Sequence, residues 1–505
     1  MTSPSPTPAS FEFVRQLADQ AFSRSAGAPL VGGNAVTPLF DCTDNFPAWE
    51  AAIAAARDSI HVEMYIFAAD AFGTRLRDLL AERARAGVRV RLLYDWLGCW
   101  KEHLCGFFRP IVAAGGQTRA FNPPSLGGAA SLLGRDHRKL IVVDGRVAFV
   151  GGLCVSSRWE GDERRGGAPW RDTGVKLEGP IVRDAVLAFA DSWAACGAPL
   201  PADELPPPPA PVGEVAARLI ATTPDTANMM RLDLLIASFA RRTLWLSDAY
   251  FMANGLYLTA LKHAAQDGVD VRLLVPRSSD IGWIATVSRT LYRPLLLAGV
   301  RVYEWDGPMM HGKTAVADGR WARIGSTNLN WSSWIANREV DVAIEDSALA
   351  GQLAERFLKD LENSTEIVLA GHKTRPVAVR PRPRAKPTLL SPSHTPRERA
   401  GAAAVRQAAR LGDAFGAVVR GTRTVDLSEA AAFLTIGLFF VALALLMAFF
   451  PYLVAAPLAL LSLLSGGAIT LKAVNLFRAR RRRKLAEAAT LAAAAVPPDD
   501  APPAQ

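Results

Sequence analysis

The sequence predicts an α/β fold made of two similar lobes, followed by a C-terminal pair of membrane-spanning helices. Three observations support this prediction. A strand–helix–strand pattern occurs twice in the first 370 residues, a His–Lys–Asp motif occurs twice at matched spacing, and two long apolar segments follow residue 429. We expect the two lobes to pack side by side and to build one composite site.

The first lobe is expected over residues 1–200. It contains the segment SIHVEMYIFAADAFGTRLRDLLAERARAGVRVRLLYDW, which begins at Ser59. This segment begins with an apolar strand and a turn. An amphipathic helix with Leu76 and Leu80 on one face follows, and then a Gly-Val step and a second apolar strand. This order is typical of a parallel βαβ unit.

The second lobe is expected over residues 214–368, after a Pro-rich segment at 201–213. Its segment TLWLSDAYFMANGLYLTALKHAAQDGVDVRLLVPRSSD begins at Thr243 and has the same order of strand, helix and strand. Leu258 and Leu261 share one helical face there, as the leucines of the first lobe do. The sequence therefore predicts an internal repeat.

The C-terminal part is expected to associate with a membrane. Residues 369–428 are rich in Pro and Arg without apolar periodicity, which is typical of an extended, disordered linker. Residues 430–450 and 452–470, within a predicted hairpin at 429–472, contain no charged residue, and each has about the length that a spanning helix needs. A basic tail, 473–505, follows.

The distribution of charge predicts how this hairpin is oriented in the membrane and which kinds of partner the protein binds. Cations precede the first apolar segment and follow the second, so both ends of the hairpin are expected in the cytoplasm, with the catalytic lobes facing that leaflet. The net charge is +9, but nineteen basic against seven acidic residues after residue 370 leave −3 for the lobes. A nucleic-acid-binding domain usually carries a basic surface of its own, so no nucleic-acid partner is expected.

The cysteines and the N-terminus add two weaker expectations. The five cysteines are scattered without metal-ligand spacing, so we expect free thiols in a reducing compartment and no metal ion. The first residues lack the charged and apolar regions of a secretory signal.

The duplicated motif carries the chemistry. HRKLIVVDGRVAFVGG begins at His137, and HGKTAVADGRWARIGS begins at His311. Each has His, one residue, Lys, four residues, Asp, six residues, Gly, and then Gly or Ser. On a strand, residues two apart emerge on one face, so each His and Lys are expected together. One copy would be an ordinary solvated strand face, but two matched copies favour a shared reaction site.

Two His–Lys pairs suit displacement at a phosphodiester. One neutral imidazole, of His137 or His311, can attack phosphorus, while the other, protonated, acts as general acid. Lys139 and Lys313 can hold the phosphoryl oxygens as positive charges without a metal or cofactor.

Two aspartates within the motifs have two interpretations. Asp144 and Asp318 could orient or charge-stabilise the imidazoles. Each is followed by Gly, so a purely turn-forming role explains them equally well.

These motifs resemble the HxKxxxxD signature of the phospholipase D superfamily. The resemblance covers roughly residues 46–368. After the second motif, GSTNLNWSSWIANREVDVAIED is similar to the family's Gly-Ser-x-Asn extension and its later Asn-x-Glu. After the first, PWRDTGVKLEGPIV is similar to bacterial cardiolipin synthases.

The resemblance implies roles for individual residues. It makes one of the two motif histidines the nucleophile and the other the general acid, and the two lysines the phosphate ligands. Ser326 and Asn328 are expected to line the site, and Glu339 to support it. One position departs from the family, because Cys154 stands where the first copy should have Asn. A thiol cannot reproduce the hydrogen bonds of an amide.

The expected function is that of a membrane-anchored phosphatidyltransferase of cardiolipin synthase type, working through a phosphohistidine. Anionic phospholipids such as phosphatidylglycerol are the expected partners, and the bacterial inner membrane is the expected location. A phospholipase D hydrolase, a nuclease of the superfamily and a catalytically idle scaffold are the alternatives. Transfer and hydrolysis share their first half-reaction, so the sequence does not separate them.

Overall fold

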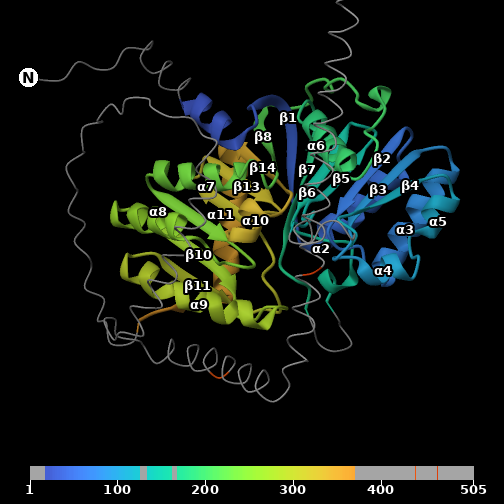
Figure 1. Ribbon diagram of the computed structural model, residues 1–505. Coiled ribbons are helices and arrows are strands. Elements are labelled where there is room, and N and C mark those ends of the chain that lie inside the picture. Colours follow the sequence, from blue (N-terminus) through green and yellow to red (C-terminus); the bar gives the residue numbers. More distant parts are fainter. Residues whose placement is uncertain (1–17, 125–133, 162–167, 370–437, 439–462, 464–505) are drawn as a thin grey trace, which may run out of the picture. The chain divides into compact units, whose positions relative to one another are not determined.

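The structure of the chain is a computed structural model that describes residues 18–124, 134–161 and 168–369, together with Leu438 and Leu463 (Figure 1). These residues confirm the predicted α/β fold with two similar lobes. The strands of both lobes belong to one mixed sheet of fifteen strands.

The first lobe contains seven strands in the described residues: β1 (Val31–Phe40), β2 (Ser59–Met64), β3 (Arg89–Asp95), β4 (Gln117–Phe121), β5 (Lys139–Val143), β6 (Val147–Gly151) and β7 (Thr173–Glu178). Its helices are α2 (Asp41–Ala54), α3 (Ala71–Arg85), α4 (Trp100–Leu104), α5 (Arg109–Ala113) and α6 (Val182–Ala195), with short 3₁₀ turns η2 (Ser157–Trp159) and η4 (Ala202–Glu204).

The second lobe repeats this order. Its strands are β8 (Val215–Thr222), β9 (Thr243–Ser247), β10 (Asp270–Pro276), β11 (Arg301–Trp305), β12 (Thr314–Ala317), β13 (Trp321–Gly325), β14 (Glu339–Glu345) and β15 (Ser364–Ile367). Its helices are α7 (Asn228–Phe239), α8 (Gly255–Gln266), α9 (Gly282–Leu297), α10 (Trp331–Ile335) and α11 (Ser347–Glu362).

The sheet order shows the duplication. It runs β15-β11-β10-β9-β12-β13-β14-β8-β1-β7-β6-β5-β2-β3-β4, so the two lobes meet at the antiparallel pair of β1 and β8. Parallel pairs occur at equivalent places, β2–β3–β4 in the first lobe and β9–β10–β11 in the second. Each lobe therefore contains the predicted βαβ units.

Helices α3 and α8 begin and end for the same reasons. The side chain of Asp70 accepts a hydrogen bond from the Gly73 amide at the start of α3, and Asn254 caps α8 in the same way. Both helices end before a glycine of positive φ, Gly87 at +92° and Gly268 at +95°. A left-handed residue of this kind stops a helix and turns the chain back toward the sheet.

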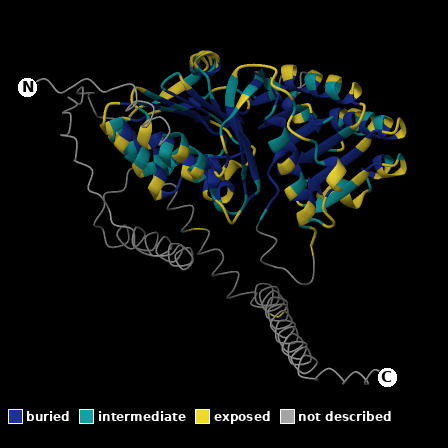
Figure 2. Cartoon of the chain, turned by 90° about the horizontal axis from the view of Figure 1, so that it is seen from above, coloured by how far each residue is buried: buried dark blue, intermediate teal, exposed yellow. Residues whose placement is uncertain are grey.

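Three main apolar cores stabilise the lobes and their junction. One lies beneath α2, α3 and α5, and a second beneath α7, α8 and α9. The third joins α6 and α11 to strands of both lobes, including β6 and β14. Figure 2 shows the strands buried and the exposed residues on the surrounding helices. The shared core fixes the two lobes against each other.

No helix within the described ranges is long and apolar enough to cross a membrane. The predicted spans, 430–450 and 452–470, lie outside the described residues apart from Leu438 and Leu463.

Candidate active site

The two duplicated motifs meet at the junction of the lobes. The backbone amide of His137 donates to the carbonyl oxygen of Arg338 at 2.9 Å, and that of His311 donates to the carbonyl oxygen of Arg171 at 2.7 Å. Each histidine is therefore tied to the chain just before a strand of the opposite lobe, β14 or β7. The motifs build one site rather than two separate ones.

His137 is held by a carboxylate of the second lobe. Its Nδ1 lies 2.9 Å from Oε2 of Glu339. Ser326 Oγ donates to the same oxygen at 2.6 Å, and Asn337 Nδ2 donates to Oε1 at 3.3 Å. Ser326, which was expected to line the site, and Glu339, which was expected to support it, thus both hold one imidazole.

His311 is held in the same way by the first lobe. Its Nδ1 lies 2.7 Å from Oδ2 of Asp172. The indole of Trp159 donates to that oxygen at 2.8 Å, and the amide of Thr173 donates to Oδ1 at 2.8 Å. Asp172 and Glu339 are completely buried, so each histidine has a fixed carboxylate partner from the other lobe.

Burial decides the protonation of these pairs. It lowers the pKa of His137 and, together with the nearby Lys313 ammonium, lowers the pKa of His311 to about 4. Burial alone would raise the pKa of both carboxyl groups, but the imidazoles and lysines outweigh it and hold the pKa of Glu339 and of Asp172 below the ordinary range. An ionised carboxylate only accepts hydrogen bonds, so each Nδ1 carries the proton and each Nε2 keeps its lone pair.

Each lysine lies against the histidine of its own motif. Lys139 Nζ donates to the carbonyl oxygen of that histidine at 2.7 Å, and Lys313 Nζ does so at 2.5 Å. The ammonium groups also lie 5.1 Å from the ring centre of Tyr65 and 5.8 Å from that of Tyr250. Burial lowers the pKa of Lys313 to about 8. Two buried cations therefore lie beside the two imidazoles.

The two half-sites differ in one contact. Lys313 Nζ lies 3.1 Å from Nδ1 and 3.2 Å from Nε2 of His311, almost equally far from both ring nitrogens. Within the described residues, no equivalent hydrogen bond reaches Nε2 of His137. Among the described contacts, only His311 therefore has an ammonium against its ring nitrogens, because Lys139 Nζ contacts the carbonyl oxygen of His137.

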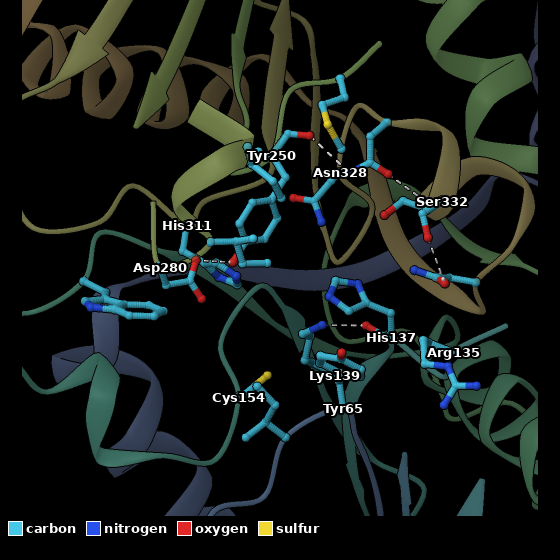
Figure 3. A pocket seen from close by; sticks show the side chains of 18 of the residues that line it. Tyr65, Arg135, His137, Lys139, Cys154, Tyr250, Asp280, His311, Asn328 and Ser332 are labelled. Carbon is cyan, nitrogen blue, oxygen red and sulfur yellow. Dashed lines mark hydrogen bonds between the residues drawn. The ribbon is translucent and has the colours of Figure 1, made fainter. Parts of the chain in front are cut away.

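A pocket of about 410 Å³ opens between the half-sites. In Figure 3, His137 and Lys139 lie on one side of it and His311 on the other. Asn328 and Cys154 also line it. The structure therefore brings together all four His and Lys residues of the motifs, with Ser326, Asn328 and Glu339 beside them.

Cys154 occupies the position in the first lobe that Asn328 occupies in the second. Each follows the last residue of its strand, β6 or β13, by three positions. Oδ1 of Asn328 is buried and accepts no hydrogen bond from the described residues. Burial raises the pKa of the Cys154 thiol, so this side of the pocket presents a neutral thiol where the other presents an amide.

Asp144 and Asp318 lie elsewhere, which corrects the expectation that they orient the imidazoles. Each occupies its hairpin turn with a φ of +53°. Each carboxylate accepts from three consecutive backbone amides at 2.7–3.2 Å, those of residues 57–59 for Asp144 and 241–243 for Asp318. The strand between His137 and Asp144 spans about 16 Å. The turn-forming interpretation therefore holds for both aspartates.

Asp172 is the site residue that the sequence reasoning missed. The signal was present, because Arg171-Asp172 and Arg338-Glu339 are equivalent Arg–acid pairs at the start of β7 and β14. Aligning the two repeats beyond the Gly positions would have paired Asp172 with Glu339.

The comparisons with known proteins agree with this geometry. The family described as "Cardiolipin synthase, PLD-like domain" matches residues 50–158 and 235–361. The cardiolipin synthase of Geobacillus kaustophilus is 35% identical over 343 residues, which are 67% of this chain and 68% of that protein.

The chain belongs to the cardiolipin synthase family. The major cardiolipin synthase ClsA of Bacillus subtilis is another relative, 31% identical over 69% of this chain and 73% of that protein. These matches confirm the predicted enzyme class, a phosphatidyltransferase of cardiolipin synthase type within the phospholipase D superfamily.

A solved structure shares the fold of this cardiolipin synthase family member. The phosphatidylserine synthase of Haemophilus influenzae superposes with a TM-score of 0.54 at 12% identity, over 69% of this chain and 91% of that one. Such a low identity bears on the fold alone.

Proposed function

We propose that the chain joins two molecules of phosphatidylglycerol into cardiolipin and releases glycerol. The observation that carries this proposal is the crossed pairing of His137 with Glu339 and of His311 with Asp172 on opposite sides of one pocket. A displacement in two steps needs one group that attacks and one that moves a proton, held at fixed positions.

In the first step, Nε2 of His137 attacks the phosphorus of the donor lipid. A P–N bond forms while the bond from phosphorus to the glycerol headgroup oxygen breaks. His311, protonated on Nε2, gives that proton to the leaving oxygen, and glycerol departs. Lys139, Lys313 and Asn328 hold the non-bridging oxygens as negative charge develops on them.

In the second step, the headgroup hydroxyl of another phosphatidylglycerol attacks the phosphatidyl-histidine. Its proton passes to Nε2 of His311, a new P–O bond forms, and the P–N bond breaks. His137 leaves as a neutral imidazole, and both histidines return to their starting protonation states. Water in place of the second alcohol would give phosphatidic acid.

The assignment of His137 as nucleophile rests on the Lys313 ammonium, which lies within 3.2 Å of both ring nitrogens of His311. A positive charge this close lowers the basicity of the imidazole and makes it a poorer nucleophile. A phosphodiester anion between the half-sites adds negative charge and raises the pKa of His311, which prepares it to act as the acid.

The test of the reaction uses the purified full chain with phosphatidylglycerol and a series of acceptor alcohols. We expect cardiolipin and glycerol in equal amounts. Phosphatidic acid as the main product at all acceptor concentrations would instead indicate a hydrolase. Cleavage of DNA without turnover of lipid would indicate a nuclease.

The test of the mechanism is a rapid denaturing quench with lipid labelled at phosphorus. In the unaltered chain we expect acid-labile label on His137, and His137→Ala should abolish it. In His311→Ala, labelled His137 should accumulate only if another donor protonates the leaving group. Label on His311 in the unaltered chain would reverse the two roles.

We also propose that a membrane hairpin, residues 430–450 and 452–470, anchors the lobes (1–200 and 214–368) to the cytoplasmic face of a bacterial inner membrane. The support is the charge-free sequence of both segments and the cations on both outer sides. The basic linker, 369–428, would then lie along anionic lipid.

A further inference from the structure

Three exposed tryptophans lie in or beside segments that line the pocket or contact its wall. All twelve tryptophans of the chain lie in the described residues, and three of them are largely exposed: Trp100 at 45%, Trp283 at 60% and Trp331 at 44%. An indole left in water is unfavourable unless something covers it.

On the second-lobe side, the mouth is formed by the start of α9. Ile281 and Trp283 line the pocket and are also exposed. Val287 lies four residues after Trp283, on the same helical face, and is exposed as well. Trp331, at the start of α10, has pocket-lining residues on both sides in the sequence.

On the first-lobe side, the turn after β3 packs against the pocket wall. Cys99 Sγ donates to the carbonyl oxygen of Tyr65, which lines the pocket, at 3.5 Å. Leu97, Trp100 and Leu104 project from this turn and from α4, and each is exposed by 45% or more. The two groups of residues follow equivalent strands, β3 and β10, and α4 and α9 both lie along the lower side of Figure 1.

The chemistry of this rim suits the headgroup region of a bilayer. Tryptophan is enriched where an apolar environment meets water, and aliphatic side chains beside it add buried area. Exposed cations accompany the rim: Lys101, whose ammonium lies 5.5 Å from the Trp100 ring centre, and Arg158 at the pocket. They complement the negative charge of anionic lipids.

We propose that this rim, made of Leu97, Trp100, Leu104, Ile281, Trp283, Val287 and Trp331, lies in the headgroup region of an anionic phospholipid bilayer. The lipid headgroup then enters the pocket while the acyl chains stay in the membrane. This inference rests on the proposed function, because it takes the substrate to be a membrane phospholipid.

The direct test is quenching of tryptophan fluorescence in the full chain, reconstituted in phosphatidylglycerol vesicles that carry lipid brominated near the headgroup. Residues 429–472 contain no tryptophan, so any quenching reports on the lobes. We expect marked quenching, most of which disappears in the triple variant Trp100→Phe/Trp283→Phe/Trp331→Phe.

Absence of quenching would mean that a second copy or the chain's own apolar segments cover the rim, and would overturn the proposal. Quenching unchanged in the triple variant would do the same.

The functional test compares two forms of substrate. Trp100→Ser and Leu104→Ser, neither of which lines the pocket, are expected to lower turnover on vesicles by about tenfold and to leave turnover of monodisperse short-chain phosphatidylglycerol nearly unchanged. Leu358→Ser, at an apolar site on α11 whose exposure (42%) is close to that of Trp100, is the matched control and should change neither. Equal loss on both substrates would contradict the proposal. An unaltered chain that turns over neither substrate would contradict the proposed function. The fluorescence quenching would then still test whether the rim lies in the bilayer.

Discussion

Glu339 and Asp172 hold the two histidines through short hydrogen bonds to Nδ1, and both carboxylates are completely buried. Replacing either by its amide removes the charge that stabilises a protonated imidazole and permits the wrong tautomer. We expect Glu339→Gln and Asp172→Asn each to lower kcat by about 10²- to 10⁴-fold while KM changes little. Steady-state kinetics on short-chain lipid measures this.

The matched control is Asp144→Asn. Its carboxylate binds backbone amides at a hairpin turn, so the change should weaken the fold by about 1–3 kcal/mol and leave kcat within a few-fold. A loss of kcat in Asp144→Asn as large as in Glu339→Gln would restore the aspartate to the catalytic set.

Cys154 leaves the first half-site without the amide that Asn328 supplies in the second. Cys154→Asn would place a donor toward the phosphoryl oxygens, and one added hydrogen bond is worth about 1 kcal/mol, or roughly a fivefold lower KM. Asn328→Cys should raise KM by a similar or larger factor. If Cys154→Asn instead raised KM, the thiol would be fitted to the acyl or headgroup atoms and not to phosphate.

Lys313 gives the reaction an alkaline limit. Its pKa falls from 10.5 to about 8 because it is buried, so its positive charge is present below pH 8 and lost as the pH rises through that value. We expect kcat/KM to decline above about pH 8. An arginine at this position keeps its charge above pH 8, so in Lys313→Arg the decline of kcat/KM should move to higher pH, although the variant should be slower than the unaltered chain. If the decline stayed at the same pH in Lys313→Arg, it would be due to another group.

At the scale of elements, the site depends on how the start of β7 is held. Arg171 offers its carbonyl oxygen to the amide of His311, and its side chain pairs with Asp360 of α11 at 2.8 Å and with Asp41 of α2 at 3.2 Å. Removing one partner of a buried ion pair leaves a buried charge, which costs about 3 kcal/mol or more. Arg356 also contacts Asp360, so the loss should fall at the low end.

Arg171→Met is therefore expected to lower both the denaturation midpoint and kcat. Arg171→Met/Asp360→Leu should recover part of the stability, since it removes the unpaired carboxylate as well. Chemical denaturation in detergent, followed by tryptophan fluorescence, measures both variants. Equal midpoints for Arg171→Met and the unaltered chain would show that the ion pairs do not hold β7.

The sequence predicted those elements whose cause is local. The two βαβ units followed from apolar periodicity and from the glycines that end α3 and α8, and the Asp-Gly turns followed from residues that accept positive φ. Spacing within one motif could not tell whether Asp144 reaches its own His or a backbone turn. The partner of His311 could not follow from spacing at all, because Asp172 is 139 residues away and is brought close by the joined sheets and the shared core of the lobes.

At the scale of the whole molecule, the candidate active site and the proposed membrane hairpin lie in different parts of the sequence. The lobes carry a net charge of −3, and the residues after 370 carry +12. The described sheet, cores and pocket all lie within residues 18–369. The lobes should therefore fold without the C-terminal segments, whereas stable attachment to a bilayer should require them.

Deleting residues 421–505 tests this division. The truncated chain keeps eleven cations between Lys373 and Arg420, each contributing about 1 kcal/mol of attraction near an anionic surface at low salt. Salt screens such attraction, so turnover on vesicles should fall steeply with ionic strength in the truncated chain and only slightly in the full chain. Flotation with vesicles at low and high salt measures the binding directly.

A truncated chain that still requires detergent for extraction would refute the hairpin. One that becomes soluble but fails on monodisperse lipid would show that the apolar segments also shape the active site, because substrate delivery no longer limits that assay.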